Sequence, residues 1–534
     1  MSKGRVRGTL SMGVAVGSLV SMAANAQMTP GDLLVSSSTY TDPGFGVGWA
    51  LPNSAGITAV ASSAFCGNAN CSVNVWNNDT VDANFGITSN LYLSSINTTT
   101  GAVDNTVNVT ALAAAQGVNL VTSFSSKSEG ALNLTPDGTA VTFMGYNTTV
   151  GQLDVSNANT PGVIEPGNTD TATATYRGVA QFGLSNSSLQ YTTTNAYNGN
   201  NGRAAILGAN GEYYMVGNGG NGSGSAATTA GTGVQLLTPG VNATPSTPGT
   251  TQVASYNITQ NGYAADKTAK DNNFRGETIY NGVLYVTKGS GSNGIDTVYQ
   301  VGPAGMTAST TNPTATASGA LTVLPGFSTV LAKTTPTAAD PVNHPFGLFF
   351  ANSTTLYVAD EGSGAASDIS GSLTGENGST SFEQGGLQKW SLVSGVWQLD
   401  YTLRGSLIGS TYSVNGTGAL AGSSLATSVD GLRNLTGQVN ANGTVSLYAA
   451  TSTIGSNLGD AGADPNQIVE ITDNLAATTA GAVSGENYTV LDTAALGQVY
   501  RGVALAPVPL PAAAWLLLSG LGGLGVAVRR RAAA

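Results

Sequence analysis

The stretch that decides the fold is RGETIYNGVLYV, residues 275–286. Two short runs of strand-forming residues flank Asn281-Gly282, a pair that favours the type I′ turn of a β-hairpin. Helical periodicity is nearly absent between residues 30 and 505, where similar runs alternate with clusters of Gly, Asn, Asp and Thr. The stretch therefore predicts one β-hairpin within an all-β body.

The same phrase recurs as an entry with Gly or Arg, a strand, a turn, and a second strand that contains Tyr. Further copies start at Glu129, Arg203, Phe346 and Arg433. Their turns lie at residues 136–138, 210–211, 352 and 442–443. The Asp-Gly and Asn-Gly pairs in these turns again predict type I′ geometry. Third strands are expected at residues 297–301, 387–390 and 467–471.

Repetition of this kind predicts a β-propeller for the body of the chain, residues 27–506. The entries at 203, 275, 346 and 433 lie 72, 71 and 87 residues apart. Since a four-stranded blade needs about 40 to 50 residues, each blade would carry long insertions. The sequence YRGVA at 176–180 returns at 500–504, and a late strand that completes a ring is how propellers avoid exposed edges. We favour seven blades over six or eight, and a β-sandwich array or a β-helix is the alternative architecture.

Three phrases of the body are similar to those of a known family. They read SEGAL at 128–132, LYVAD at 356–360 and GLQKW at 386–390. They resemble an exported bacterial propeller family with NHL-like blades, and the likeness covers most of the body with loose motifs. The resemblance implies the fold and little about activity.

Residues 1–26 have the three parts of a secretory signal peptide. Three basic residues among the first seven form a positive start, and residues 10–22 are apolar but short for a membrane span. Ala24-Asn25-Ala26 is an A-x-A cleavage signal. We therefore expect cleavage after Ala26, which makes Gln27 the mature N-terminus, and an uncleaved anchor is the alternative.

Residues 507–534 form a candidate sorting tail, in which the strip Val508-Pro509-Leu510-Pro511 precedes an apolar run. The run from Ala512 to Val528 has no charge, and its 17 residues would reach roughly 26 Å as a helix, the lower limit for a membrane span. Trp515 is placed for the outer interface. The cluster Arg529, Arg530 and Arg531 would hold the C-terminus in the cytoplasm, so the body would lie outside.

This arrangement resembles the PEP-CTERM sorting signal in its VPLPA form. The second motif residue is Pro509 rather than Glu, which indicates a variant subfamily with its own exosortase-type processing enzyme. The resemblance implies a Gram-negative bacterium, a transient inner-membrane anchor, and cleavage near the motif. It also implies delivery of the exported body to the cell surface or the extracellular matrix.

The charge of the body excludes one class of partner. Six of the 18 basic residues lie in the two end segments, which lack Asp and Glu, so the body has 12 basic against 29 acidic residues and a net charge of −17. An acidic body repels phosphate backbones, so we expect no nucleic-acid partner.

The two cysteines, Cys66 and Cys71, lie in one short stretch with Gly67. In an oxidising compartment this spacing predicts a local disulfide. One histidine and no further cysteine cannot complete a tetrahedral set, so we expect no metal. Nucleotide-binding fingerprints are absent from the sequence as well, so we expect no cofactor.

Residue types that carry catalysis are scarce. The one histidine, His344, precedes a blade entry in NHPFG, where a turn role is the plainer interpretation, and no nucleophile elbow accompanies it. Carboxylates that could face a central channel are Asp360, Glu361, Glu129, Glu277 and Asp296. A glycosidase or lyase needs two carboxylates at a set separation, so a pocket with two or more acids and an Arg would favour an enzyme.

We therefore expect a non-enzymatic surface or matrix protein whose propeller binds polysaccharide or protein partners. The sorting tail, the few catalytic residue types and a surface rich in Thr, Asn and Ser favour this function. The alternative is a secreted carbohydrate-active or esterase-type enzyme that uses carboxylates near Asp360.

Overall fold

The computed structural model describes the chain from Gln27 to Val508 with gaps. The described residues are 27–40, 50–51, 59–60, 87–124, 126–152, 155–157, 175–197, 199–219, 230–244, 249–264, 270–291, 293–302, 321–334, 344–364, 385–417, 422, 424–455 and 462–508. The expected signal peptide before Gln27, the pair Cys66 and Cys71, and the tail from Pro509 onward lie outside them, so these predictions stay open. Among the described residues, no helix combines the length and the apolar character that a membrane span requires.

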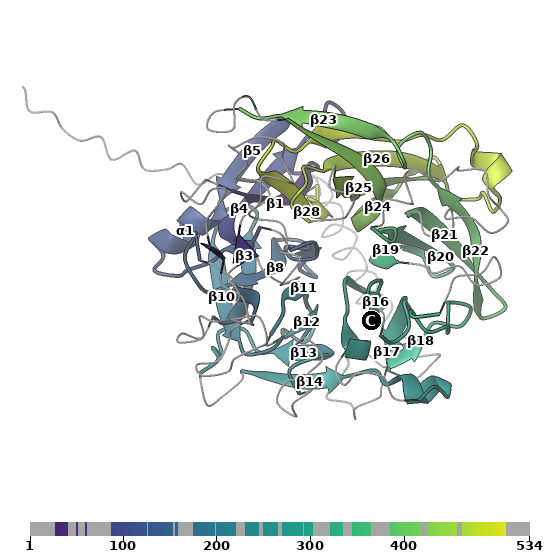
Figure 1. Ribbon diagram of the computed structural model, residues 1–534. Coiled ribbons are helices and arrows are strands. Elements are labelled where there is room, and N and C mark those ends of the chain that lie inside the picture. Colours follow the sequence, from purple (N-terminus) through teal and green to yellow (C-terminus); the bar gives the residue numbers. More distant parts are fainter. Residues whose placement is uncertain are drawn as a thin grey trace, which may run out of the picture.

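The body is a β-propeller of six antiparallel blades around a central channel (Figure 1). Blade 1 contains β28 (Gln498–Leu505), β1 (Leu33–Thr39), β4 (Thr88–Ile96) and β5 (Val103–Asn108), with β6 (Thr122–Ser123) beside β4. Blade 2 contains β7 (Asn133–Leu134), β8 (Ala140–Tyr146), β9 (Arg177–Gly183) and β10 (Leu189–Thr194). Blade 3 contains β11 (Gly202–Leu207), β12 (Tyr213–Gly217), β13 (Val234–Leu237) and β14 (Thr250–Ala254).

The other three blades follow in the same direction around the ring. Blade 4 contains β15 (Glu277–Tyr280), β16 (Val283–Lys288), β17 (Thr297–Val301) and β18 (Leu321–Val323). Blade 5 contains β19 (Pro345–Asn352), β20 (Thr355–Asp360), β21 (Gly386–Val393) and β22 (Val396–Leu403). Blade 6 contains β24 (Ser424–Val439), β25 (Thr444–Gly455), β26 (Gln467–Asn474) and β27 (Thr489–Thr493), with β23 (Thr411–Asn415) on the first part of β24.

A few short elements lie outside the blades. The helix α1 (Val109–Ala115) follows β5, and the side chain of Asn108 caps its start by accepting a hydrogen bond from the backbone of Ala111. Strands β2 (Ala50–Leu51) and β3 (Ala59–Val60) pair with each other. Short 3₁₀ helices lie at Val155–Asn157, Ile258–Asn261, Lys270–Asn272 and Ala480–Val483.

The predicted propeller is confirmed, but it has six blades and not the seven that we favoured. The sequence YRGVA at 500–504 lies in β28, the innermost strand of blade 1, whereas its copy at 176–180 overlaps β9, the third strand of blade 2. The copy at 176–180 therefore starts no blade of its own. The three expected third strands are confirmed as β17, β21 and β26.

Ring closure joins the two ends of the body in one sheet. Strand β28 pairs with β1 in antiparallel register from Leu33 opposite Leu505 to Thr39 opposite Gln498. The last strand of the body thus occupies the channel side of blade 1, while β1, β4 and β5 complete that blade outward (Figure 1). Closure of this kind leaves no unpaired strand edge at the seam.

The hydrophobic core is divided among the spaces between blades. One buried cluster joins blades 3 and 4 through side chains such as Tyr214 and Tyr299, and another joins blades 5 and 6 through Tyr357 and Leu447. Comparable clusters fill the spaces between blades 1 and 2, 2 and 3, 4 and 5, and 6 and 1. Because each blade buries both faces against its neighbours, its strands are apolar on both sides rather than on alternate residues.

The predicted type I′ turn is confirmed at one hairpin and wrong at three. Both Asn281 and Gly282 have positive φ angles, 49° and 76°, as type I′ geometry requires. At the other three turns only the glycine is positive: Gly138, Gly211 and Gly443. Those hairpins have longer loops, in which Thr135, Gly208 and Asn440 donate backbone hydrogen bonds to residues four or five positions later.

A glycine follows the entry arginine where neighbouring innermost strands approach closely. A Cβ atom on Gly276 would overlap the carbonyl oxygen of Phe346 in blade 5, and one on Gly502 would overlap that of Gly130 in blade 2. The Arg-Gly pair in the repeated phrase therefore has a packing reason, because only glycine lets the strands around the channel come this close.

Candidate functional site

The innermost strands of all six blades enclose a cavity of about 220 Å³ on the channel axis. Its lining residues include the apolar Leu132, Ile206, Phe349 and Leu435, but polar atoms make up the larger part of the exposed wall. Polar groups in the wall are Asn133, Glu277, Thr278, Asn434 and Thr436. Small-molecule sites are usually concave and predominantly apolar with a few polar groups, so this cavity is more polar than most such sites.

Charged residues surround the channel at one end of this cavity. In five blades a charged residue lies one or two positions before the cavity-lining segment: Glu129, Arg203, Arg275, Arg433 and Arg501. In blade 5 the corresponding position is Phe346, and Glu361, which follows β20, supplies the charge instead. We call these six charged residues the entry ring, and all six are buried.

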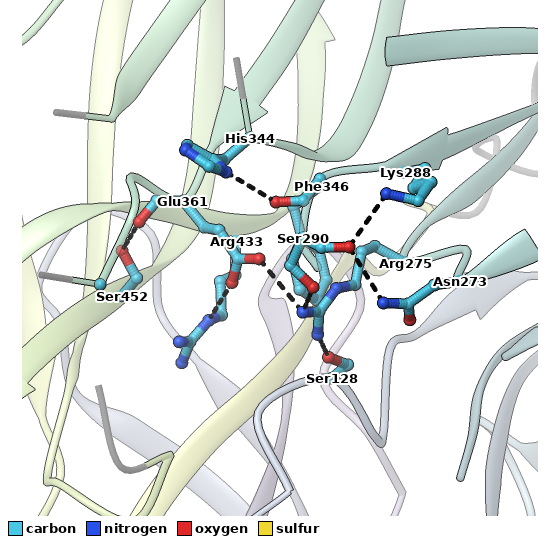
Figure 2. A network of polar contacts seen from close by, with 12 residues as sticks. Ser128, Asn273, Arg275, Lys288, Ser290, His344, Phe346, Glu361, Arg433 and Ser452 are labelled. Atoms are coloured by element: carbon cyan, nitrogen blue, oxygen red, sulfur yellow. Dashed lines mark hydrogen bonds and ion pairs between the residues drawn. The ribbon is translucent and has the colours of Figure 1, made fainter. Parts of the chain in front are cut away.

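Glu361 joins two arginines of the entry ring, as Figure 2 shows. One carboxylate oxygen accepts a hydrogen bond from Nε of Arg433 at 3.1 Å, and the other lies 3.6 Å from a guanidinium nitrogen of Arg275. The backbone carbonyl of Glu361 also accepts a hydrogen bond from the hydroxyl of Ser452. Blade 5 is thereby tied to blades 4 and 6 through one side chain.

Arg203 and Arg275 also bind across blade boundaries, whereas Arg501 binds a residue that follows β6 of blade 1. Arg203 of blade 3 donates to the carbonyl oxygen of Phe274 at 2.7 Å, at the entry of blade 4. Arg501 of blade 1 donates to the carbonyl oxygen of Phe124, and Arg275 donates to the hydroxyls of Ser128 and Ser290. Ser128 precedes the innermost strand of blade 2, so its contact with Arg275 joins blades 2 and 4, which are not neighbours in the ring.

Glu129 is the acid of the entry ring on the side of blade 2. It accepts hydrogen bonds from the hydroxyl of Tyr146 at 2.6 Å and from the backbone N–H of Ser123 at 2.9 Å. Burial raises the pKa of the Glu129 carboxyl, while these hydrogen bonds and the charge of Arg501 act in the opposite direction. Burial, and after it the like charge of Arg275, lowers the pKa of Arg203.

Glu277 differs from the two acids of the entry ring. It belongs to the cavity wall on β15, its residue is 6% exposed, and neither carboxylate oxygen has a hydrogen-bond partner. Burial raises the pKa of Glu277 well above its usual value, and no neighbouring group offsets that effect. It is the one carboxyl among the described residues of the cavity wall.

The other predicted candidates lie away from the cavity wall. Asp360 accepts hydrogen bonds from the side chain of Gln388 at 2.7 Å and from the backbone N–H of Gly362 at 3.0 Å. Asp296 pairs with the buried Lys288. His344 lies 3.9 Å from Asp296, and its Nδ1 atom is 2.9 Å from the carbonyl oxygen of Gly289.

The structure therefore brings three of the five predicted carboxylates to the channel, as Glu277 in the wall and Glu129 and Glu361 in the entry ring. Asp360 and Asp296 take part in buried contacts within blades 5 and 4. Sequence reasoning missed the arginines as site residues and treated them as markers of a blade entry. Their recurrence in four blades, one or two positions before the segment that lines the cavity, is the signal that could have placed them around the channel.

Comparison with known proteins adds no family. No protein-family model and no curated protein matches the chain. Within the part of the chain that the structure describes, no three His, Cys, Asp or Glu side chains gather as a metal site.

Proposed function

We propose that this protein is an exported propeller of the cell surface or extracellular matrix that acts as a binding scaffold. Its proposed delivery uses the signal peptide before Gln27 and the VPLPA-type tail, which an exosortase-type enzyme would process. Polysaccharide or surface proteins are the proposed partners.

The place where the chain leaves the propeller is the observation that carries this proposal. Gly31 donates a backbone hydrogen bond to the carbonyl of Ala506, and Ala506 donates one to Asp32, so both described ends lie at the same end of β28. Arg501 lies near the other end of that strand, about 13 Å from Leu505 at the rise of an extended chain. A propeller tethered through residues beyond Val508, which is 71% exposed, would therefore present its entry ring away from the membrane.

The number of carboxylates in the cavity wall, and the contacts that the other carboxylates make, favour binding over catalysis. Two opposed carboxylates are the minimum for most glycosidases, but the described cavity wall contains one. Glu361 and Glu129 are engaged by arginine, tyrosine and backbone donors. The alternative of a secreted hydrolase near Asp360 has the weaker support, because that carboxylate is held by Gln388 and Gly362.

Intact-mass analysis of the protein from cell envelope and from culture medium tests the proposal. We expect the released protein to begin at Gln27 and to lack Arg529, Arg530 and Arg531. A mass from the medium that includes these arginines would show that the tail is no sorting signal. Replacing Pro509 and Pro511 with Ala should let the helix extend into the proline strip, so that the uncut protein accumulates in the inner membrane.

The same preparation tests the predicted disulfide. Labelling with a thiol reagent under denaturing, non-reducing conditions should modify neither Cys66 nor Cys71. Two labelled cysteines would show that Cys66 and Cys71 are not joined.

A further inference from the structure

The end of the propeller opposite the entry ring exposes apolar side chains from four blades. Each innermost strand runs from the entry ring to this end, and antiparallel pairing brings the turn between the third and fourth strands back to it. Because the described chain also leaves the body here, beyond Leu505, we call this end the tail face. Its exposed large hydrophobic side chains include Val103, Val241, Val393, Val396, Val439 and Val508, which are 42–71% exposed.

Two of these valines form the tip of a hairpin in blade 5. Val393 pairs with Val396 across the turn between β21 and β22, where Ser394 and Gly395 have positive φ angles of 52° and 84°. Directly opposite residues of an antiparallel pair lie on the same face of the sheet, so the two valines are neighbours. The tip of blade 5 therefore presents a pair of apolar side chains to its surroundings.

The other valines are spread around the same end of the propeller. Val103 starts β5 in blade 1, Val439 ends β24 in blade 6, and Val241 lies in the loop between β13 and β14 of blade 3. In Figure 1 these blades lie on different sides of the channel. Since the apolar side chains surround the channel and do not gather in one groove, a broad, flat surface would contact them together.

The chain beyond Val508 determines what the tail face meets. In the proposed anchor the apolar run begins at Ala512, so only residues 509–511 separate the tail face from the membrane. Three extended residues reach at most roughly 11 Å. The attachment is also close to the channel axis, because β28 is the innermost strand of blade 1 and its Val503 lines the central cavity. A body held centrally by so short a connection has its tail face against the bilayer.

The charges of the tail face select the kind of lipid. Asp104, beside Val103, and Asp137, in the turn between β7 and β8, are both exposed at this end. Anionic lipids give a membrane a negative surface potential, which would repel these carboxylates. Zwitterionic headgroups carry no net charge, so they allow the valines to approach without that penalty.

We propose that the tail face docks on a bilayer surface of zwitterionic lipid, with its exposed valines among the headgroups. The proposal rests on the membrane anchor proposed above and adds a second contact with the membrane, made by the body itself. Exposed apolar side chains at an interface of this kind mark a surface for membrane or protein contact, and the short connection favours the membrane.

Photolabelling from lipid tests the docking on the wild-type protein. The full chain is reconstituted into phosphatidylcholine vesicles that contain a lipid with a diazirine at the start of its acyl chain, and labelled peptides are mapped by mass spectrometry. We expect label in residues 512–528, in the hairpin tip at 393–396 and at the end of β24. The internal control is β23, which pairs with the part of β24 that precedes Arg433, and it should carry little or no label.

Matched variants separate docking from mere proximity to the membrane. The double variant Val393→Asp, Val396→Asp changes only exposed positions and should lower the label at the end of β24 about threefold or more. Ser413→Asp, at an exposed position of β23, is the control and should leave that label unchanged. An equal mixture of phosphatidylcholine and phosphatidylglycerol at low salt should also lower the label on the tail face. An undiminished label in the double variant, or a stronger label with phosphatidylglycerol, overturns the proposal.

The outcome is separable from that of the anchor. Label in residues 512–528 without label on the tail face would mean that another surface, such as a second copy of the chain, covers this end, and it overturns the docking alone. Absence of label in residues 512–528 overturns the anchor, and the docking falls with it.

Discussion

The Nε atom of Arg433 lies 3.1 Å from a carboxylate oxygen of Glu361, and this contact joins blade 6 to blade 5. The other oxygen of Glu361 faces Arg275 of blade 4 at 3.6 Å (Figure 2). Three blades thus depend on one carboxylate that is almost fully buried. Buried arginines of this kind need a partner, because an unpaired charge in the interior is far more costly than an unpaired amide.

The first prediction concerns this carboxylate. Replacing Glu361 with Gln keeps its shape but removes the charge between Arg275 and Arg433, so we expect the free energy of unfolding to fall by about 3–5 kcal/mol. Urea denaturation followed by fluorescence measures the change. Asp104→Asn, at an exposed position of β5, is the control and should not lower stability, because it removes a negative charge close to Asp32. A Glu361→Gln protein as stable as that control would show that the contact contributes nothing.

Much of the propeller could be predicted from the sequence because most blades repeat the same phrase for the same physical reasons. Gly276 and Gly502 follow an arginine because the next blade leaves no room for a Cβ atom, and Asn281-Gly282 gives the tight turn that the phrase predicts. The turn depends on neighbouring residues in the chain, and the close approach of strands recurs at the same place in blades 4 and 1, so both leave a repeated pattern in the sequence.

The number of blades and the partners of the arginines could not be read in the same way. Arg177 and Arg501 share the sequence YRGVA, yet one lies in β9 of blade 2 and the other in the innermost strand of blade 1. The position of a strand within its blade depends on long-range pairing, which five residues do not encode. Likewise, Glu361 follows β20 in the sequence but lies in the entry ring of the folded chain, where it pairs with Arg433. The sequence does not indicate this position.

The second prediction concerns a buried ion pair between blades 5 and 6. Lys389 lies 2.8 Å from Asp473, which also accepts a hydrogen bond from the hydroxyl of Tyr401 at 2.7 Å. Lys389→Met leaves the carboxylate of Asp473 buried without its cation, so we expect a loss of about 3–5 kcal/mol of stability. The double variant Lys389→Met, Asp473→Leu should lose less than the sum of the two single losses. Additive losses in this double-mutant cycle would mean that the two charges do not interact.

The third prediction is a pH dependence at Glu486. Burial, and then the neighbouring Asp473, raises the pKa of Glu486 to about 7. The folded state therefore holds this proton more tightly than the unfolded state does, and stability is lost as the pH rises from about 4.5 through about 7. Glu486→Gln should flatten that part of the stability curve and be more stable than wild type at pH 8. Unfolding curves at pH 4.5, 6, 7 and 8 measure it, and an unchanged slope in the variant would refute the assignment.

The fourth prediction tests the seam of the ring at Gly502. A Cβ atom at this position would overlap the carbonyl oxygen of Gly130 and the backbone N–H nitrogen of Leu132, so blade 1 would have to move away from blade 2. Backbone atoms cannot turn aside as a flexible side chain can, so Gly502→Ala should destabilise the propeller by about 1–3 kcal/mol, the usual range for overpacking.

The matched control is Gly485→Ala, where an added Cβ atom meets nothing within 4 Å. That change should be neutral or slightly stabilising, because it reduces the freedom of the unfolded chain. Thermal unfolding of both variants separates the two cases, since a general effect of the substitution would lower both melting temperatures and a steric effect at the seam lowers one. Equal melting temperatures for Gly502→Ala and Gly485→Ala would contradict the prediction. They would show that β28 can move away from blade 2 without loss of stability.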